Sequence, residues 1–489
     1  MVYYYTIGGF PVFWNENKMK LAIKKKKQQT KHEIDMVNGP VLGKMLIFAL
    51  PLMMSSILQL LFNAADIIVV GRWAGDNSLA AVGSTASLIN LMVNLFVGLA
   101  VGANVLTAKF FGAKKDKELS ETVHTVVMMS VVSGIGLAAV GIVFAEPILR
   151  LMQSPQNVLK LAALYLRIYF LGMPAMMIYN FGSAVLRAKG DTKRPLYYLT
   201  IAGVINVCLN LFFVIKLHMD VAGVAAATSI SQFVSAWMVI RCLKNENDAF
   251  KLEFKKLRIH KNRMLSIMKI GLPAGFQGML FSLSNVVIQA AINTFGDVAM
   301  AGSAAAANIE GFVYFGMNAF YQAAISFTSQ NVGAGKYERI KPILTGTVSM
   351  AVITGLVMGV GAYVFGPFLL GIYSTNDAVI AQGMIRLAFI CLPYALCGIM
   401  DTLVGVLRGL GYSVMPMIVS LVGACLSRIV WIATLFQLPM FHKVEFIYVS
   451  YPVTWTITAL VHMICLMWIF EHKVKPIMEK KKELENGLC

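Results

Sequence analysis

Residues 49–76 read ALPLMMSSILQLLFNAADIIVVGRWAGD, an apolar run that carries a proline near its start, an Asn-x-x-Asp pair in its second half and Gly-Asp at its end. Residues 271–297 read GLPAGFQGMLFSLSNVVIQAAINTFGD and repeat that layout. Leu50-Pro51 corresponds to Leu272-Pro273 and Asn63 to Asn285 at a shift of 222 residues. Two segments that share so many fixed points indicate an internal duplication.

The same register continues beyond these two segments, at a shift of 221 residues. Matched pairs are 75–76 with 296–297, 112–114 with 333–336, 185–188 with 406–409, 190 with 411, and 195 with 416. A register that holds over roughly 150 residues makes chance a poor explanation, and the chain is expected to contain two copies of one unit.

The composition places both copies in a membrane. Of the 489 residues 58% are hydrophobic and 13% are charged, whereas soluble domains average about 45–50% and about 25%. This balance predicts a polytopic membrane protein and excludes a disordered chain, a collagen and a disulfide scaffold. The seven cysteines include no C-x-x-C pair, so neither a disulfide framework nor a metal site is expected.

The fold predicted from these runs is an all-α membrane protein with twelve transmembrane helices, because a spanning helix needs about 20 mostly apolar residues. Six helices, an even number, separate the copies, so the two halves should enter the membrane in the same direction as parallel repeats. Substrate is then expected at their interface. The predicted spans are 44–70, 78–108, 122–146, 161–185, 195–216, 221–243, 265–294, 298–329, 343–371, 379–405, 414–437 and 446–470.

The positive charge predicts the orientation. The net charge is +18, and 34 of the 42 Lys and Arg residues lie in the two tails and the even-numbered connections. Positively charged loops resist translocation, so both termini are expected in the cytoplasm and the protein in the plasma membrane. Basic residues spread over short connections do not form a nucleic-acid-binding face, and no nucleic acid partner is expected.

The chain is therefore divided into five parts. A cytoplasmic tail (1–40) precedes the N-lobe (41–243), a basic linker (244–263), the C-lobe (264–470) and a second tail (471–489). Residues 1–18 look unlike the rest and are either an upstream extension or a tail. Phe250, Phe254 and Leu257 are helically spaced, which is typical of a surface helix on the bilayer, but a plain tether explains the linker equally well.

At this point the residues resemble a known family. The pattern of Pro51, Asp66, Gly71-Arg72 and Gly75, the run VLRAKGDTKRP at 185–195 and VLRGLGYSVMP at 406–416 are similar to those of the multidrug and toxic compound extrusion (MATE) transporters. The resemblance implies two six-helix lobes forming a V around a central cleft. It also implies that proton or sodium entry drives export of organic cations.

Three acids are placed deep within predicted spans: Asp66, Glu310 and Asp401. An ionisable group in hydrocarbon costs at least about 2.5–3.5 kcal/mol, so each needs a reason, and ion coupling is the functional one. The resemblance implies that Asp66 is the coupling carboxylate of the first helix. The alternative for Asp66 is a structural carboxylate, and for Glu310 a buried hydrogen bond that joins two helices.

Arg428 is the deep basic residue, and helical rise places it within reach of Asp401. A static Asp401–Arg428 ion pair and a pair that opens for a cation or drug are both consistent with this depth. The sodium-coupled branch of the family has acids near the positions of Phe281 and Cys397, where this chain has none, so a proton is the expected coupling ion.

Polar side chains on apolar helices are further candidates. They either line the cleft or hold helices together, and they are Asn63, Gln277, Asn285 and Asn180. Pro174 and Pro393 lie within predicted spans, where a lost backbone hydrogen bond permits a kink.

The predicted function is an antiporter that exports amphipathic or cationic compounds in exchange for protons, or sodium, by alternating access. No phosphate-binding loop, H-E-x-x-H or G-x-S-x-G motif is present, so no enzyme activity, cofactor or metal is expected. The alternative is a flippase for lipid-linked precursors, and a membrane scaffold is a more distant one. Small-molecule substrates and the lipid bilayer are the expected partners of a monomer.

Overall fold

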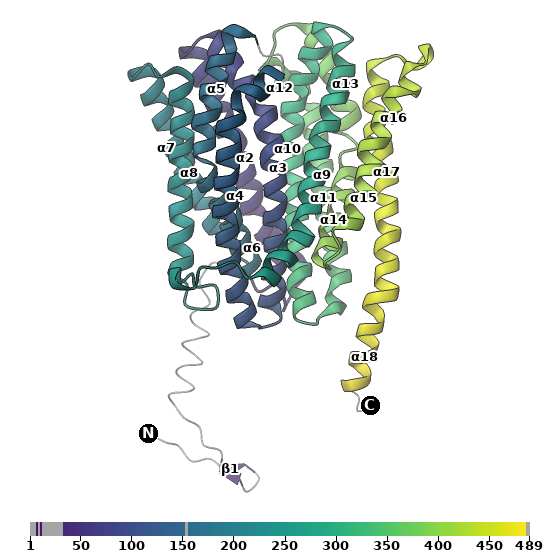
Figure 1. Ribbon diagram of the computed structural model, residues 1–489. Coiled ribbons are helices and arrows are strands. Elements are labelled where there is room, and N and C mark those ends of the chain that lie inside the picture. The colour runs from purple at the N-terminus through teal and green to yellow at the C-terminus, as the bar shows by residue number, and fades with distance from the viewer. Residues whose placement is uncertain (1–5, 8–9, 12–32, 152–154, 486–489) are drawn as a thin grey trace.

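A computed structural model of the chain shows one bundle of long helices (Figure 1). The structure describes residues 6–7, 10–11, 33–151 and 155–485. Within these ranges the only strands are β1 (Thr6–Ile7) and β2 (Phe10–Pro11), an antiparallel pair. The prediction for residues 1–18 falls almost wholly outside the described residues.

The helices follow one another in chain order. They are α2 (Val41–Trp73), α3 (Asp76–Gly112), α4 (Asp116–Leu151), α5 (Gln156–Leu171), α6 (Met173–Lys189), α7 (Lys193–Leu211), η1 (Phe212–Lys216), α8 (Asp220–Lys244), η2 (Phe254–Lys256), α9 (Lys261–Asn293), α10 (Asp297–Gly333), η3 (Tyr337–Arg339), α11 (Ile340–Val364), α12 (Gly366–Gly371), α13 (Asp377–Ile390), α14 (Ala395–Gly409), α15 (Val414–Ser420), η4 (Leu421–Leu426), α16 (Ser427–Ala433), η5 (Leu435–Gln437), η6 (Pro439–Phe441), α17 (Val444–Ile469), η7 (Phe470–Val474) and α18 (Lys475–Glu485).

These helices form twelve crossings within the described chain. Nine stretches are long and apolar enough to cross a membrane, and two bent pairs, α5 with α6 and α13 with α14, raise the number to eleven. The twelfth is α10, whose 37 residues match the length of α3, its counterpart in the repeat. Its composition alone does not mark it as a span, because its buried face carries Ser, Thr, Gln and Asn side chains.

The two predicted kinks are confirmed. The axes of α5 and α6 meet at 47°, and Pro174 is the second residue of α6. The axes of α13 and α14 also meet at 47°, across a break that contains Pro393. The repeat therefore bends the same crossing in each half, because proline cannot donate the backbone hydrogen bond that would continue the helix.

Two large hydrophobic cores divide the bundle. One is built from residues between Val69 and Ile267, and the other from residues between Ile288 and Val474. The two halves meet symmetrically at the ends of α3 and α10. A Cβ on Gly112 would lie 2.0 Å from the Gln330 carbonyl oxygen, and one on Gly333 would lie 2.0 Å from that of Lys109. This reciprocity is that of parallel repeats around an axis along the membrane normal, as predicted.

The first halves of α2 and α9 cross to the opposite half of the molecule. Met45, Phe48 and Leu52 of α2 share a core with Phe320 and Phe327 of α10, and Ile267 of α9 belongs to the core of the first half. Each lobe is thus completed by a helix segment that the chain order assigns to the other.

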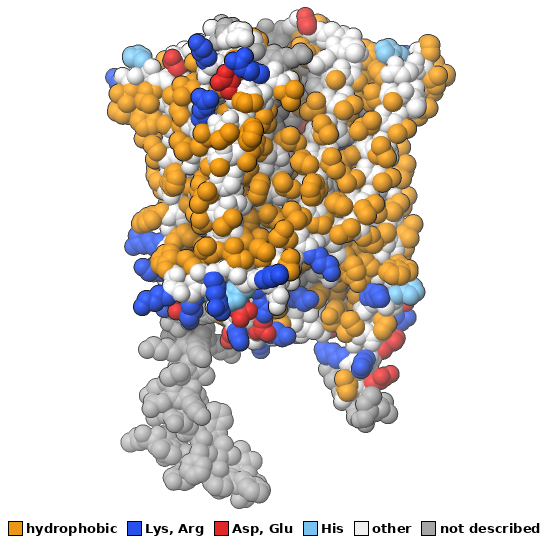
Figure 2. Space-filling view, viewed as in Figure 1, with side chains coloured by type: hydrophobic (Ala, Val, Ile, Leu, Met, Phe, Trp, Pro, Cys, Tyr) orange, Lys and Arg blue, Asp and Glu red, His pale blue; other side chains and the backbone are white. Residues whose placement is uncertain are grey.

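Of the two interpretations of the linker, a surface helix and a plain tether, the surface helix is not formed in the described structure. Residues 245–260 contain one short turn of helix, η2, and Phe250 is fully buried against Phe111, with ring centroids 5.1 Å apart. Both ends of the described chain lie on the linker side of the bundle (Figure 1), which we call the termini face. Lys and Arg side chains gather along this border of the apolar belt (Figure 2).

Candidate functional site

Asp66 lies in the second half of α2 and faces two other helices of the first lobe. Its Oδ1 accepts a hydrogen bond from the Asn210 side chain of α7, and its Oδ2 accepts one from the Thr228 hydroxyl of α8 at 3.4 Å. Asn206 donates to the same Thr228 oxygen at 3.2 Å. No Lys or Arg of the described chain lies within ion-pair distance of Asp66.

This polar cluster is not fully satisfied. Asn210 is completely buried, and its side-chain oxygen has no hydrogen-bond partner in the part of the chain that the structure describes. A small crevice lies beside the cluster where α5 breaks into α6, and Thr228 lines it together with Tyr169 and Gly172. A buried acceptor without a donor is costly, so this site is suited to receive a proton or a donor group.

Glu310 of α10 forms an ion pair with Arg386 of α13. Its Oε2 accepts hydrogen bonds from Arg386 of α13, from Nε at 3.1 Å and from Nη2 at 2.7 Å. Tyr394 donates to Oε1 at 3.2 Å, and Arg386 also donates to Ser303 at 2.8 Å. The arrangement matches the second sequence interpretation of Glu310, a buried contact that joins two helices.

Asp401 of α14 has no hydrogen-bond or ion-pair partner in the part of the chain that the structure describes. Two turns further along the same helix, Arg408 is buried and donates to the Tyr321 hydroxyl and, at 2.8 Å, to Gln277 Oε1. Among the described residues its Nε has no hydrogen-bond partner. Asp401 and Arg408 thus lie two turns apart on one helix without forming an ion pair in the described structure.

The described structure contains no Asp401–Arg428 ion pair, so a static pair is not formed, whereas a pair that opens stays a prediction. Arg428 instead donates from Nε to the Thr454 hydroxyl at 2.9 Å. Its guanidinium carbon lies 4.1 Å from the Tyr451 ring centroid and 5.6 Å from that of Trp455. Its exposed fraction is 2%, and Nη2 has no hydrogen-bond partner within the described chain. The rotation of the helix about its axis turns the Arg428 side chain toward α17.

The four polar candidates occupy different surroundings. Gln277 is buried and accepts the hydrogen bond from Arg408. Asn180 donates to the Met176 carbonyl oxygen of its own helix at 2.9 Å. Asn63 and Asn285, the repeat counterparts, are both exposed on the protein surface. Only Gln277 is thus joined to a candidate ionisable group.

Small residues hold the first half of α9 against α3 of the first lobe. A Cβ on Gly98 would lie 2.1 Å from the Gly275 nitrogen, and one on Gly102 would lie 2.3 Å from the Ile267 carbonyl oxygen, so glycine lets these two helices approach closely. The boundary between the lobes is crossed by Asn104 of α3 and Ser326 of α10, which exchange hydrogen bonds of 3.2 Å. Together with the contacts of Gly112 and Gly333, these bonds join the lobes toward the termini face.

Two residues that contact the candidate acids were not among the candidates from the sequence. Arg386 is one of the eight Lys and Arg residues outside the tails and the even-numbered connections, although its place seven residues inside the predicted span 379–405 signalled a buried partner. Asn210 was one of several polar residues on a predicted span, and nothing in its spacing pointed to Asp66. Within the described residues, no group of three or more His, Cys, Asp and Glu side chains is placed to hold a metal ion.

Comparison with known proteins agrees with the repeat. A family model described as MatE matches residues 51–212 and again residues 273–434. The chain is 27% identical over 428 residues to "Probable multidrug resistance protein YoeA" of Bacillus subtilis, covering 85% of this chain and 91% of that protein. It is 22% identical over 354 residues to "FAD transporter" of Shewanella oneidensis, covering 71% and 77%.

The fold also has solved counterparts. "Outward-facing conformation of a multidrug resistance MATE family transporter of the MOP superfamily" is similar with a TM-score of 0.84 and 18% identity, covering 92% of this chain and 100% of that chain. Similarity at this level concerns the architecture alone, and the two-lobe arrangement of twelve helices is common to both chains.

Proposed function

Because this chain belongs to the MatE family of multidrug and toxic compound extrusion transporters, we propose that it exports amphipathic, cationic compounds across the plasma membrane in exchange for protons. The two lobes supply alternating access. The termini face is cytoplasmic, since the basic residues gather there. The protein acts as a monomer, because the lobe interface on which this mechanism depends lies within one chain.

The observation that carries this proposal is the Asp66 cluster. Asp66 is held by two neutral donors, from Asn210 and Thr228, and by no cation of the described chain. A carboxylate in such surroundings exchanges its charge readily for a proton, because neither protonation state is fixed by an ion pair. The buried Asn210 oxygen without a partner offers an acceptor when Asp66 carries the proton.

The two other acids take different parts in this proposal. Asp401 is a second ion-coupling group, since it lies within α14 of the other lobe and has no hydrogen-bond or ion-pair partner among the described residues. Glu310 positions α10 against α13 through Arg386, and it is not free to take up a cargo cation while that pair holds. Proton rather than sodium coupling follows from the apolar Phe281 and the thiol Cys397 at positions where the sodium-coupled relatives are expected to carry acids.

The test uses proteoliposomes loaded with an ethidium-like dye under an imposed proton or sodium gradient, one at a time. The native chain is expected to transport the dye when a proton gradient is imposed and not when a sodium gradient is imposed. A matching proton flux should accompany the dye. Asp66→Asn should abolish both fluxes while the protein elutes and unfolds as the native chain does. Undiminished coupled transport by that variant would remove Asp66 from the mechanism.

Arg408 and Arg428 favour a second candidate, the export of anionic cargo such as a dinucleotide or a lipid-linked precursor. Both guanidiniums are buried, and within the described chain neither has a carboxylate within 4.0 Å. A relative named as an FAD transporter points the same way. Counterflow of FAD in the same vesicles, without movement of the cationic dye, would establish this candidate in place of the first.

A further inference from the structure

Residues 33–40, the segment just before α2, are folded against the termini face. Asp35 Oδ1 accepts the backbone N–H groups of Val37 and Asn38 at 3.0 and 3.1 Å, which closes a tight turn. Lys44 in the first turn of α2 donates to the carbonyl oxygens of Asp35 and Asn38 at 2.7 and 2.6 Å. Burial alone would raise the pKa of Asp35, but the hydrogen bonds from Asn38 and Val37 outweigh it and hold the pKa below its usual value.

One side of this segment binds the first lobe. The Ile34 N–H donates to the Gly190 carbonyl oxygen at 3.2 Å. Gly190 has a φ of +105°, and a Cβ there would lie 2.4 Å from the Ile34 carbonyl oxygen, so only glycine permits this approach. Glu33 forms an ion pair with Lys189 at 2.7 Å.

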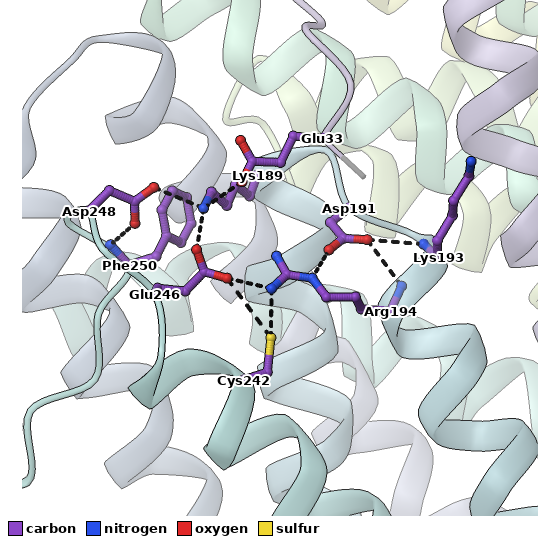
Figure 3. A network of polar contacts seen from close by, with 9 residues as sticks. All are labelled: Glu33, Lys189, Asp191, Lys193, Arg194, Cys242, Glu246, Asp248 and Phe250. Carbon is purple, nitrogen blue, oxygen red and sulfur yellow. Dashed lines mark hydrogen bonds and ion pairs between the residues drawn. The ribbon is translucent and has the colours of Figure 1, made fainter. Parts of the chain in front are cut away.

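Lys189 is itself fixed by the linker (Figure 3). Its ammonium lies 2.5 Å from Glu246 and 2.8 Å from Asp248, and Arg194 binds Glu246 from the other side at 2.5 Å. Burial alone would raise the pKa of Glu246, but Lys189 and Arg194 together hold that pKa below its usual value. Glu246 is therefore ionised near neutral pH, and its ion pair holds the Lys189 ammonium in place to pair with Glu33.

The other side of the segment grips the second lobe. Asn331 at the end of α10 donates to the Met36 carbonyl oxygen at 3.0 Å, and Lys336 donates to Asn38 Oδ1 at 2.6 Å. Arg339 donates to the Gly39 carbonyl oxygen at 2.9 Å. Met36 is fully buried in the same core as Phe327 of α10.

From these two sets of contacts we infer that residues 33–40 are a latch that holds the lobes together at the termini face. The inference rests on the proposed alternating access, in which the lobes must part at this face once per cycle. We call the contacts with the first lobe the first grip and those with the second lobe the second grip. One grip must then open, and it is the first, which consists of Glu33–Lys189 and Ile34–Gly190. The second lobe holds the latch through three side chains, through buried Met36 and through the first half of α2.

The first experiment measures opening without any transport. Ser326, fully buried at the lobe boundary, is replaced by cysteine as a reporter thiol in a chain in which Cys208, Cys465 and Cys489 are serine. Glu33→Ala should raise the rate of maleimide labelling by about fivefold, since one partly buried ion pair of the closed state is lost. Lys341→Ala, an exposed lysine on the same face, is the control and should leave the rate unchanged. An unchanged rate in Glu33→Ala would overturn the latch.

The second experiment fixes each grip in turn with a short bis-maleimide. Glu33→Cys with Asp248→Cys bridges the first grip, since both carboxylates flank Lys189, and Asn38→Cys with Lys336→Cys bridges the second. The first bridge should reduce both labelling of the reporter thiol and dye export at least about tenfold, whereas the second should leave both within about twofold. If instead the second bridge reduced labelling and export while the first did not, the inference that the Glu33–Lys189 side opens would be overturned.

These two readouts separate the latch from the proposed function. If the unbridged protein labels as expected but exports no dye, the proposed function fails and the latch stands. If it exports dye while the first bridge changes neither labelling nor export, the latch fails and the proposed function stands.

Discussion

The interiors of the two lobes share one architecture and differ in charge. In the first lobe, Asp66 meets only amide and hydroxyl groups from α7 and α8. In the second, Arg428 of α16 packs on α17, and Glu310 is neutralised by Arg386. Helices α7 and α8 correspond to α15–α16 and α17 in the repeat. Duplication thus preserved the helix packing, whereas the ionisable groups inside the two lobes diverged: among the described residues Asp66 has only neutral partners, whereas Glu310 and Arg386 neutralise each other.

The largest expected effect concerns the Glu310–Arg386 pair. Glu310→Ala leaves Arg386 buried without a carboxylate, and breaking one partner of a buried pair costs about 3–5 kcal/mol of the free energy of unfolding. Thermal unfolding in detergent should show a large loss, and Glu310→Met with Arg386→Met should restore most of it. A stable Glu310→Ala chain that no longer transports would instead make Glu310 a coupling group and end the contrast between the lobes.

The Asp66 site should lose function and keep stability. Asp66→Asn retains the size of the side chain and its contacts with α7 and α8, so we expect the coupled export rate to fall by at least about 100-fold, or about 2.7 kcal/mol. Dye and proton fluxes in proteoliposomes measure this loss. Asp116→Asn, on the termini face, serves as the matched control and should transport normally.

Arg428 tests whether a lone buried cation stabilises the second lobe. Arg428→Met loses a hydrogen bond and the contact with Tyr451 but also removes a charge without a carboxylate partner, so the unfolding free energy should change by only about 1 kcal/mol. Chemical unfolding in mixed micelles gives this value. A loss as large as that of Glu310→Ala would mean that a partner carboxylate is present in the folded state.

The smallest effect is expected at Thr228. Its hydroxyl contact with Asp66 is long, at 3.4 Å, so Thr228→Val should slow export by about threefold, or about 0.7 kcal/mol. Initial rates of dye efflux would resolve this change. Ser231→Ala on the same helix, whose hydroxyl donates to the Thr228 carbonyl oxygen and not to Asp66, should not slow export.

The sequence predicts the scaffold well because periodic apolar runs and prolines act locally. The kinks at Pro174 and Pro393 and the parallel repeat appear where the residues placed them. The linker was harder, since the spacing of Phe250 and Phe254 describes a helical face equally well whether or not a helix forms.

The contacts of the candidate site depended on information that spacing does not contain. Helical rise brings residues 401 and 428 within reach of each other, yet contact also requires the rotation of each helix about its axis, which sequence distance along two separate helices leaves open. The pairing of Glu310 with Arg386 also depends on helix rotation. Helix α13 packs against α10 with the face that carries Arg386 turned toward Glu310.

The modest hydropathy of α10 has a consequence for biosynthesis. A helix that composition alone does not mark as a span is poorly retained by the translocon when it emerges by itself, and Glu310 makes this worse. Its insertion should therefore wait for α11 and α13, which pack against it, because α13 brings Arg386 to Glu310. A nascent chain stopped after α10 would leave this helix outside the bilayer, and membrane integration of the second half becomes a concerted step rather than a helix-by-helix one.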